Sequence, residues 1–154
     1  MNLEIQAVFA EEIETLAEWR VRFILDLHPE YAPKVEEIRS AIWAYIDEHL
    51  KQKRYIGYFG RSAGKIVCSA GLLLYDLPPL QPGRPRHVGH VLNFYTLPEV
   101  RRQGVGRRLM DFIIADAKSR GITRLALNAT KQGEPLYRQA GFHEQDQVDL
   151  IKEL

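Results

Sequence analysis

The stretch that decides the fold runs from Val91 to Gly106 and reads VLNFYTLPEVRRQGVG. Its first part, up to Thr96, is rich in apolar, aromatic and β-branched residues, which predicts a strand. The segment 97–103 predicts a turn, and Val105, Leu109, Phe112, Ile113 and Ala117 then repeat at helical spacing up to Gly121. The sequence therefore predicts a strand that passes through a tight turn into a helix.

The turn itself has the features of an anion-binding site. The first N–H groups of a helix lack intrahelical partners and lie at the positive end of the helix dipole, so they attract anions. Gly104 and Gly106 leave room for a phosphate to approach the backbone. Formal positive charge flanks these glycines at Arg101, Arg102, Arg107 and Arg108.

Two common nucleotide-binding loops do not match this turn. The Walker pattern G-x-x-x-x-G-K-[ST] does not occur in the chain. The dinucleotide pattern G-x-G-x-x-G would place its third small residue at Leu109, which is too large. Both nucleotide-loop interpretations of this turn therefore fail.

Working outward, the rest of the chain predicts alternating strands and helices. Before the deciding stretch we expect a strand at 5–8, antiparallel helices at 13–27 and 35–50, and a hairpin of strands at 55–59 and 65–75. Gly71 indicates a bulge or a close approach in that hairpin. The proline-rich segment 76–86 predicts a loop without regular structure.

After the third helix we expect a strand at 123–128, a short helix at 134–140 that ends at Gly141, and closing strands at Phe142 and 148–151. A strand that returns parallel after a helix requires a mixed sheet covered on both faces. Residues 1–154 are therefore expected to form one α/β domain.

Composition and length bound the class of protein. The 154 residues are 45% apolar and 27% charged, which is typical of a globular domain, and no apolar run approaches the roughly 20 residues of a membrane span. Residues 1–10 show no basic leader followed by an apolar run. The single cysteine, Cys68, cannot form an internal disulfide and is expected in the core. We therefore expect a cytoplasmic protein.

Several separate pieces match one known family in order and spacing. They are RRQGVG at Arg101–Gly106, LALN at Leu125–Asn128 and PLYRQAGF at Pro135–Phe142. Together they resemble the GNAT superfamily of acyl-CoA-dependent N-acetyltransferases. The resemblance implies a single GNAT-like domain with a mixed, mostly antiparallel central sheet, helices on both faces and a splayed acyl-CoA cleft.

The resemblance also implies which residues bind acetyl-CoA, the acyl donor. Backbone N–H groups from Arg102 to Arg107 would cradle the pyrophosphate, the strand near its end would pair with the pantetheine arm, and Asn128 would reach the same arm. The expected binding residues are Phe94, Tyr95, Thr96, Arg101, Arg102, Gln103, Gly104, Val105, Gly106, Arg107 and Asn128. No metal is expected.

The resemblance places two residues in catalysis. Tyr137 would donate a proton to the leaving thiolate, because a tyrosine hydroxyl with an ordinary pKa of about 10 keeps its proton at neutral pH. A backbone N–H at about Tyr95 would polarise the thioester carbonyl. A Glu that serves as base in histone-modifying relatives corresponds to His90 here, so either His90 or a water path would take the amine proton. His87 and His90 are expected on opposite faces of one strand and so do not share a metal.

The function expected is direct transfer of an acetyl group from acetyl-CoA to a primary amine of a small molecule or peptide. Residues 1–50 hold 4 Lys and Arg against 11 Asp and Glu, and the remaining residues hold 17 against 9. The acidic helices either select a cationic acceptor or form solvated outer faces. Tyr31, Trp43, Tyr45 and Tyr75 either line an acceptor pocket or belong to the core.

Two other functions are compatible with parts of the sequence. A non-catalytic acyl-CoA-binding or regulatory protein of the same fold would use the same turn. Nucleic-acid binding through the arginine cluster is disfavoured, because the net charge is only +1 and the arginines surround a single helix start. We expect neither a nucleic-acid nor a membrane partner. In this fold, edge strands near the C-terminus could pair across a homodimer.

Overall fold

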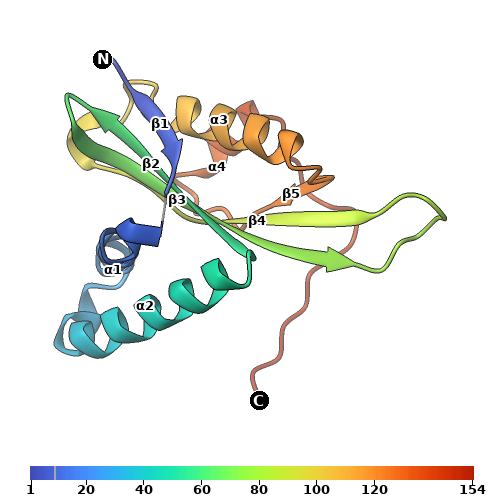
Figure 1. Cartoon of the computed structure of the whole chain (residues 1–154), viewed down its shortest axis with the longest axis horizontal. Helices are drawn as coiled ribbons and strands as arrows, with labels where there is room; N and C mark the ends of the chain where they lie inside the picture. The colour runs from blue at the N-terminus through green and yellow to red at the C-terminus, as the bar shows by residue number, and fades with distance from the viewer. Residues whose placement is uncertain (9) are drawn as a thin grey trace.

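The chain folds around a five-stranded sheet that carries helices on both faces (Figure 1). A computed structural model describes residues 1–8 and 10–154. The elements are β1 (Glu4–Ala7), η1 (Ala10–Glu12), α1 (Ile13–Leu27), η2 (Pro29–Lys34), α2 (Val35–Lys51), β2 (Tyr55–Ser62), β3 (Lys65–Leu77), β4 (Arg86–Thr96), η3 (Pro98–Val100), α3 (Val105–Ser119), β5 (Arg124–Ala126) and α4 (Glu134–Gln139). Within these residues, no helix is long and apolar enough to cross a membrane.

The strands lie side by side in chain order, from β1 to β5. Each neighbouring pair is antiparallel except β4 and β5, which are parallel because the chain crosses over through α3 between them. The predicted mixed, mostly antiparallel sheet is confirmed. The parallel pair involves only the first part of β4, and the turn that the sequence marked as an anion site follows the other end of that strand.

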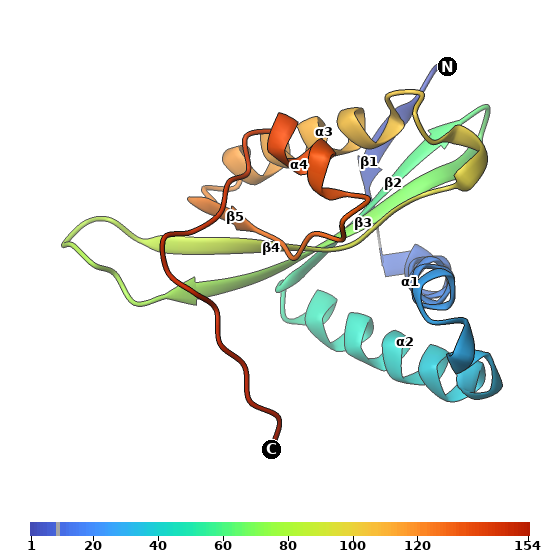
Figure 2. The same cartoon turned by 180° about the vertical axis from the view of Figure 1, so that it is seen from behind.

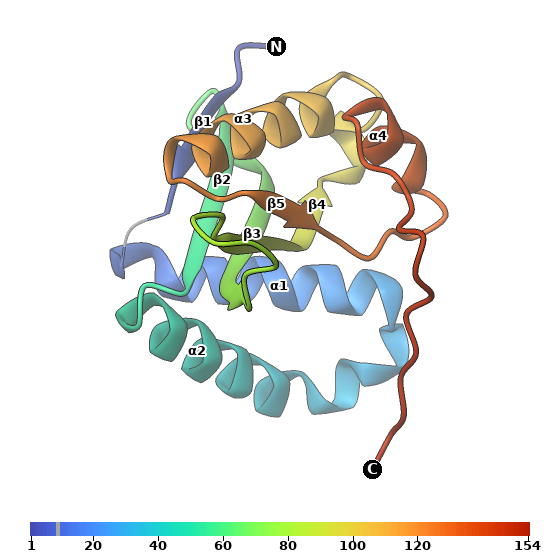
Figure 3. The same cartoon turned by 90° about the vertical axis from the view of Figure 1, so that its right-hand side faces the viewer.

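The two faces of the sheet have separate apolar cores, as Figure 3 shows with the sheet between the helix layers. On one face α3 packs through Leu109 and Ile113 against Tyr58 and Leu72. On the other face the antiparallel helices α1 and α2 cover a core that includes Trp19, Phe59 and Tyr95. Cys68 lies in the first core and is fully buried, and burial raises the pKa of its thiol to about 11, as expected of a structural cysteine.

Gly71 is both a close-approach residue and the site of a bulge. The Tyr55 hydroxyl lies 1.9 Å from the point where a Cβ of residue 71 would stand, so only glycine fits. The pairing of β3 with β4 shifts register between Ser69 and Gly71, and on β4 Asn93 takes a left-handed φ of 55°. The bulge predicted from Gly71 is thus confirmed, and it falls beside the deciding stretch.

The predicted loop at 76–86 is wrong at both ends. β3 continues to Leu77 and β4 begins at Arg86, so the irregular segment spans only 78–85. Asp76 pairs with His87 across the two strands, with 2.6 Å between Oδ1 and Nδ1. Cross-strand pairing therefore extends the hairpin to the first proline, Pro78.

The predicted closing strands are also wrong. In the described residues no strand follows α4, and the chain from 142 onward leaves the body as an extended tail (Figure 2). A strand needs a partner, and here Val148, Leu150 and Ile151 are more than four-fifths exposed. The homodimer that these strands were expected to support stays a prediction.

Candidate functional site

The sheet opens where β4 and β5 part. The two strands pair over only three residues each, Val88–His90 with Arg124–Ala126. β4 continues to Thr96 and stays paired with β3 on its other side, whereas β5 ends. The strand predicted at 123–128 is shorter for this reason, and the β4 edge beyond His90 has no β5 partner. An extended ligand can pair with such an edge.

The turn after β4 presents a row of unpaired backbone donors. Gly104 takes a left-handed φ of 80° at the N-cap of α3, and Arg102 before it has φ 60°. The N–H of Arg101 donates to Pro98 and that of Arg108 to Gly104. Between these two residues, the N–H groups from Arg102 to Arg107 make no turn, loop or cap hydrogen bond to a backbone oxygen of the described chain. Six consecutive donors at a helix start form an anion cradle.

The arginine side chains around this cradle have other partners. Arg107 pairs with Asp111 and donates to the Gln139 carbonyl, while Arg108 donates to the carbonyls of Met1 and Leu3 on the far side of α3. The expected positive charge beside the glycines is therefore mostly directed away from the turn. The backbone, rather than these guanidinium groups, is what the turn offers to an anion.

Arg101 connects the turn to α1. Its Nε donates to the Thr96 carbonyl at 2.9 Å, its guanidinium lies over the Tyr95 ring, and its NH2 nitrogen lies 3.5 Å from Asp26 Oδ2. The Tyr95 hydroxyl donates to the same carboxylate at 2.6 Å. Burial and this carboxylate raise the pKa of Tyr95 to about 12. We call Asp26, Tyr95 and Arg101 the α1–turn clamp, since it fixes the start of the turn against α1.

Tyr137 lies beside the β4 edge. Its ring contacts those of Phe94 and Phe142 edge-on, with centroids 5.6 and 6.1 Å away, and burial raises its pKa to about 12. A Cβ at Gly106 would lie 2.8 Å from the Leu136 side chain, so this glycine lets α4 approach α3. The sequence analysis explained Gly106 by the room it leaves for a phosphate. The structure adds a second reason, which is close packing of α3 against α4. The structure brings Tyr137 into contact with Phe94 of the deciding stretch, and its catalytic role stays a prediction.

Asn128 is exposed just past the end of β5. With Tyr137 it borders a cavity of about 810 Å³ between β5, the end of α3, α4 and the tail. The cavity reaches Tyr137 but not the turn at 101–107. It adjoins the opened sheet on the side where the closing strands were expected.

His90 lies on the face of the sheet that α1 and α2 cover. It pairs with Leu73, which in turn pairs with Tyr55, and side chains of directly paired residues share a face. His87, three residues earlier, is on the other face and pairs with Asp76. The proposed acid and base thus reach the opened edge from different sides of the sheet.

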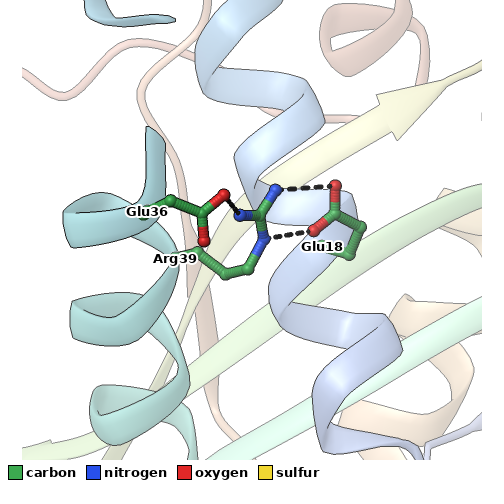
Figure 4. A network of polar contacts seen from close by, with 3 residues as sticks. All are labelled: Glu18, Glu36 and Arg39. Carbon is green, nitrogen blue, oxygen red and sulfur yellow. Dashed lines mark hydrogen bonds and ion pairs between the residues drawn. The ribbon is translucent and has the colours of Figure 1, made fainter. Parts of the chain in front are cut away.

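Most acidic side chains of the first two helices point outward or have partners. Figure 4 shows Arg39 of α2 between Glu18 of α1 and Glu36, with Nε to Glu18 Oε2 at 2.7 Å. Asp47 pairs with Lys51. Tyr31, Trp43, Tyr45 and Tyr75 are all about two-fifths exposed and thus are not core residues.

Sequence reasoning missed three polar residues on the same side of the sheet: Arg20, Tyr55 and Asn93. Arg20 interrupts the apolar stripe of α1 between Leu16 and Ile24, and this interruption is the signal that marks it. Asn93 is a polar residue within a predicted strand. Neither signal alone distinguishes a binding residue from a structural one.

Comparison with known proteins places the chain in a family. The model described as "Acetyltransferase (GNAT) family" matches residues 13–142, so the chain belongs to that family. The chain is 33% identical over 126 residues to the "Uncharacterized N-acetyltransferase YitH" of Bacillus subtilis, covering 78% of this chain and 40% of the relative. The chain therefore corresponds to less than half of that relative's length.

Solved structures share the fold. A predicted acetyltransferase with acetyl-CoA from Clostridium acetobutylicum superposes with a TM-score of 0.84 and 23% identity, covering 98% of this chain and 96% of the other. Glucosamine-6-phosphate N-acetyltransferase from Arabidopsis thaliana superposes with a TM-score of 0.65 and 15% identity, covering 99% of both chains. The resemblance inferred from the sequence motifs is confirmed, and the splayed α/β sheet is that of the family.

Proposed function

We propose that this acetyltransferase transfers the acetyl group of acetyl-CoA directly to a primary amine. The observation that carries the proposal is the row of six unpaired N–H groups from Arg102 to Arg107 at the end of an opened strand. Diphosphate oxygens are anionic acceptors that match such a row. The Clostridium acetobutylicum structure, solved with acetyl-CoA, supports the choice of donor.

The residues of the opened edge supply the binding half of the reaction. Phe94, Tyr95 and Thr96 lie on the β4 edge that lacks a β5 partner, where main-chain groups can pair with the amide groups of a pantetheine arm. We assign a backbone N–H of this open edge, at about Tyr95, to the thioester carbonyl, since a fixed donor stabilises the developing oxyanion. Asn128 is placed at the same arm from the β5 side.

The acetyl-CoA thioester supplies the activated acyl carbon. The neutral amine nitrogen forms a bond to that carbon, the carbon–sulfur bond breaks, and one proton leaves nitrogen, while the sulfur departs as a thiolate that takes a proton from solvent. His90 or a water on its face of the sheet takes the first proton. The hydroxyl of Tyr137 acts at the departing sulfur.

The raised pKa of Tyr137 supports a narrower role than full proton transfer. A pKa of about 12 lies more than three pH units above that of an ordinary thiol, about 8.5. Full proton transfer to a free thiolate is therefore uphill. Tyr137 stabilises the departing sulfur chiefly by donating a hydrogen bond, and it keeps its proton throughout the neutral range.

The test is amine-dependent release of thiol from acetyl-CoA, followed with a thiol reagent over a panel of primary amines. Release that requires both amine and protein supports the proposal. Tight acetyl-CoA binding without amine-dependent release from any member would instead favour a non-catalytic acyl-CoA-binding protein. The panel includes glucosamine 6-phosphate, because the Arabidopsis neighbour is named for that substrate.

A further inference from the structure

Arg20 is a positive charge without a counter-charge on the sheet-facing side of α1. Its neighbours one turn before and after, Leu16 and Ile24, both belong to the core beneath α1 and α2. Burial lowers the pKa of Arg20, and among the described residues no carboxylate acts on it. A half-buried cation without a partner is costly, and an anion from outside the chain would supply the missing counter-charge.

The surroundings of Arg20 are hydroxyl and amide groups. Tyr55 and Tyr45, whose rings meet edge-on at 6.4 Å, lie close enough to Arg20 that their hydroxyls would raise its pKa if ionised. Asn93 Nδ2 donates to the Tyr55 hydroxyl at 3.1 Å. Asn93 Oδ1 is buried and has no partner in the described chain. Four elements, α1, α2, β2 and β4, thus bring polar groups to one place.

This place lies on the acceptor side of the opened sheet. Tyr55 pairs with Leu73 and Leu73 with His90, so the cluster shares the sheet face of the candidate base. Asn93 lies at the bulge between His90 and the β4 edge assigned to the thioester. A ligand group held at Arg20 would therefore point the rest of the molecule along β4.

The nearby carboxylates are already engaged. Glu18 pairs with Arg39, Asp26 belongs to the α1–turn clamp, and Asp47 pairs with Lys51. Arg39 is an instructive contrast, because it has two carboxylate partners while Arg20, on the neighbouring helix, has none. No Arg20 nitrogen is among the fully buried unpaired atoms, so the guanidinium remains open to a solute.

We propose that Arg20, assisted by the Tyr55 hydroxyl that Asn93 holds in place, binds an anionic group, a carboxylate or a phosphate, on the amine acceptor. The proposal rests on the acetyl transfer proposed above and names the acceptor class: an amine that also carries a negative charge. The planar guanidinium matches two oxygens of such a group. The acidic excess of α1 and α2, which suggested a cationic acceptor, lies largely on paired or outward-facing groups instead.

The experiment compares matched amines that differ in the anion alone. The pairs are β-alanine with β-alaninamide, and O-phosphoethanolamine with ethanolamine. We expect one anionic member to exceed its neutral partner in kcat/KM by at least about tenfold, since a charge-assisted hydrogen bond is worth about 1.5–3 kcal/mol. Which pair shows the preference identifies carboxylate or phosphate. Equal rates within both pairs would overturn the proposal.

Variants of α1 assign the preference to Arg20. Arg20→Gln should bring the ratio within the preferred pair close to one, and Arg20→Lys should keep part of it. Arg22→Gln is the matched control, because Arg22 is exposed on the same helix and contacts Trp19. A ratio that Arg20→Gln leaves unchanged would contradict the assignment.

A binding measurement separates this proposal from the transfer reaction. N-acetyl-β-alanine and O-phospho-N-acetylethanolamine, with their neutral counterparts, are titrated by calorimetry into protein saturated with CoA. Binding of an anionic compound that Arg20→Gln abolishes supports the anion site even if no turnover is found. Saturable CoA binding with no binding of either anionic compound refutes the anion site and leaves the cofactor site intact.

Discussion

The two faces of the opened sheet are built in different ways. On the α3 side the cofactor site consists of backbone: unpaired N–H groups, a left-handed glycine and a strand edge. On the α1–α2 side the polar groups are side chains, such as Arg20, Asn93 and His90. A site made of backbone groups requires glycines at fixed positions, so it can be recognised as a motif in the sequence. A site made of side chains uses residues suited to one acceptor, so it has no general motif. The comparison predicts that α3-side changes affect acetyl-CoA and α1-side changes affect the amine.

The largest expected effect is on kcat and comes from Tyr137, which takes part in the reaction and in neither binding site. Tyr137→Phe should lower kcat by about 10²–10³ with little change in acetyl-CoA affinity, because only the hydrogen-bond donor at the sulfur is lost. Steady-state kinetics and calorimetry measure the two quantities. Tyr75→Phe, at an exposed tyrosine of the hairpin, is the control. An unchanged kcat would remove Tyr137 from the mechanism.

The pH profile of the wild type sharpens the same point. Since the folded pKa of Tyr137 is about 12, the hydroxyl stays protonated at pH 10, where an ordinary tyrosine would be half ionised. The rate assigned to Tyr137 should therefore stay level from pH 8.5 to 10. A fall by half at pH 10 that Tyr137→Phe removes would show that its pKa is ordinary.

His90→Gln probes the acceptor face. A base at this position takes the proton that the amine must lose, so the variant should lose about 10² in kcat at pH 8, near the lower end of general-base effects. His87→Gln, on the same strand but the opposite face, should keep kcat nearly unchanged. An unchanged kcat in His90→Gln would assign the base role to another group.

Gly104→Val tests the backbone site. A left-handed φ costs a branched residue about 1–2 kcal/mol, so the turn should distort and acetyl-CoA affinity should fall by about tenfold. Gly121→Val is a close match, because Gly121 has φ 76° at the other end of α3 and, like Gly104, has no neighbour near a Cβ. It should lower Tm similarly and leave affinity unchanged. Equal affinity losses would trace the effect to α3 stability.

Asp26→Asn tests the α1–turn clamp that joins the two faces. The change removes the charge that holds Arg101 and weakens the acceptor of the Tyr95 hydroxyl. The pair is partly exposed, so we expect only about a threefold to tenfold rise in KM for acetyl-CoA, with kcat nearly kept. Asp47→Asn, in the α2 pair with Lys51, serves as the control. An effect on amine KM alone would place Asp26 entirely on the acceptor side.

The sequence predicted the backbone half of the molecule well. The limits of α1, the position of α3 and the Gly71 bulge all followed from periodicity and glycine placement, because these are local constraints. The strands at 142 and 148–151 did not form, since a strand depends on a partner that local pattern cannot supply. The loop at 76–86 was overestimated for the converse reason, because pairing across β3 and β4 extends regular structure.

The side-chain half was less predictable. Four arginines were assigned to the turn, but Arg107 donates to the Gln139 carbonyl and Arg108 to carbonyls near the N-terminus, contacts that only the tertiary fold creates. Arg20 was overlooked, because a single charge in an apolar stripe looks like a surface residue until its neighbours are known. Residue types alone do not give the directions of long side chains.

Calorimetric titration of the folded protein with acetyl-CoA tests the central claim most directly. The claim is that the N–H groups from Arg102 to Arg107 hold the diphosphate. The account predicts one acetyl-CoA bound per chain, with an affinity that Gly104→Val weakens and Gly121→Val does not. Absence of binding by a well-folded protein would contradict the cofactor site and every role that depends on it.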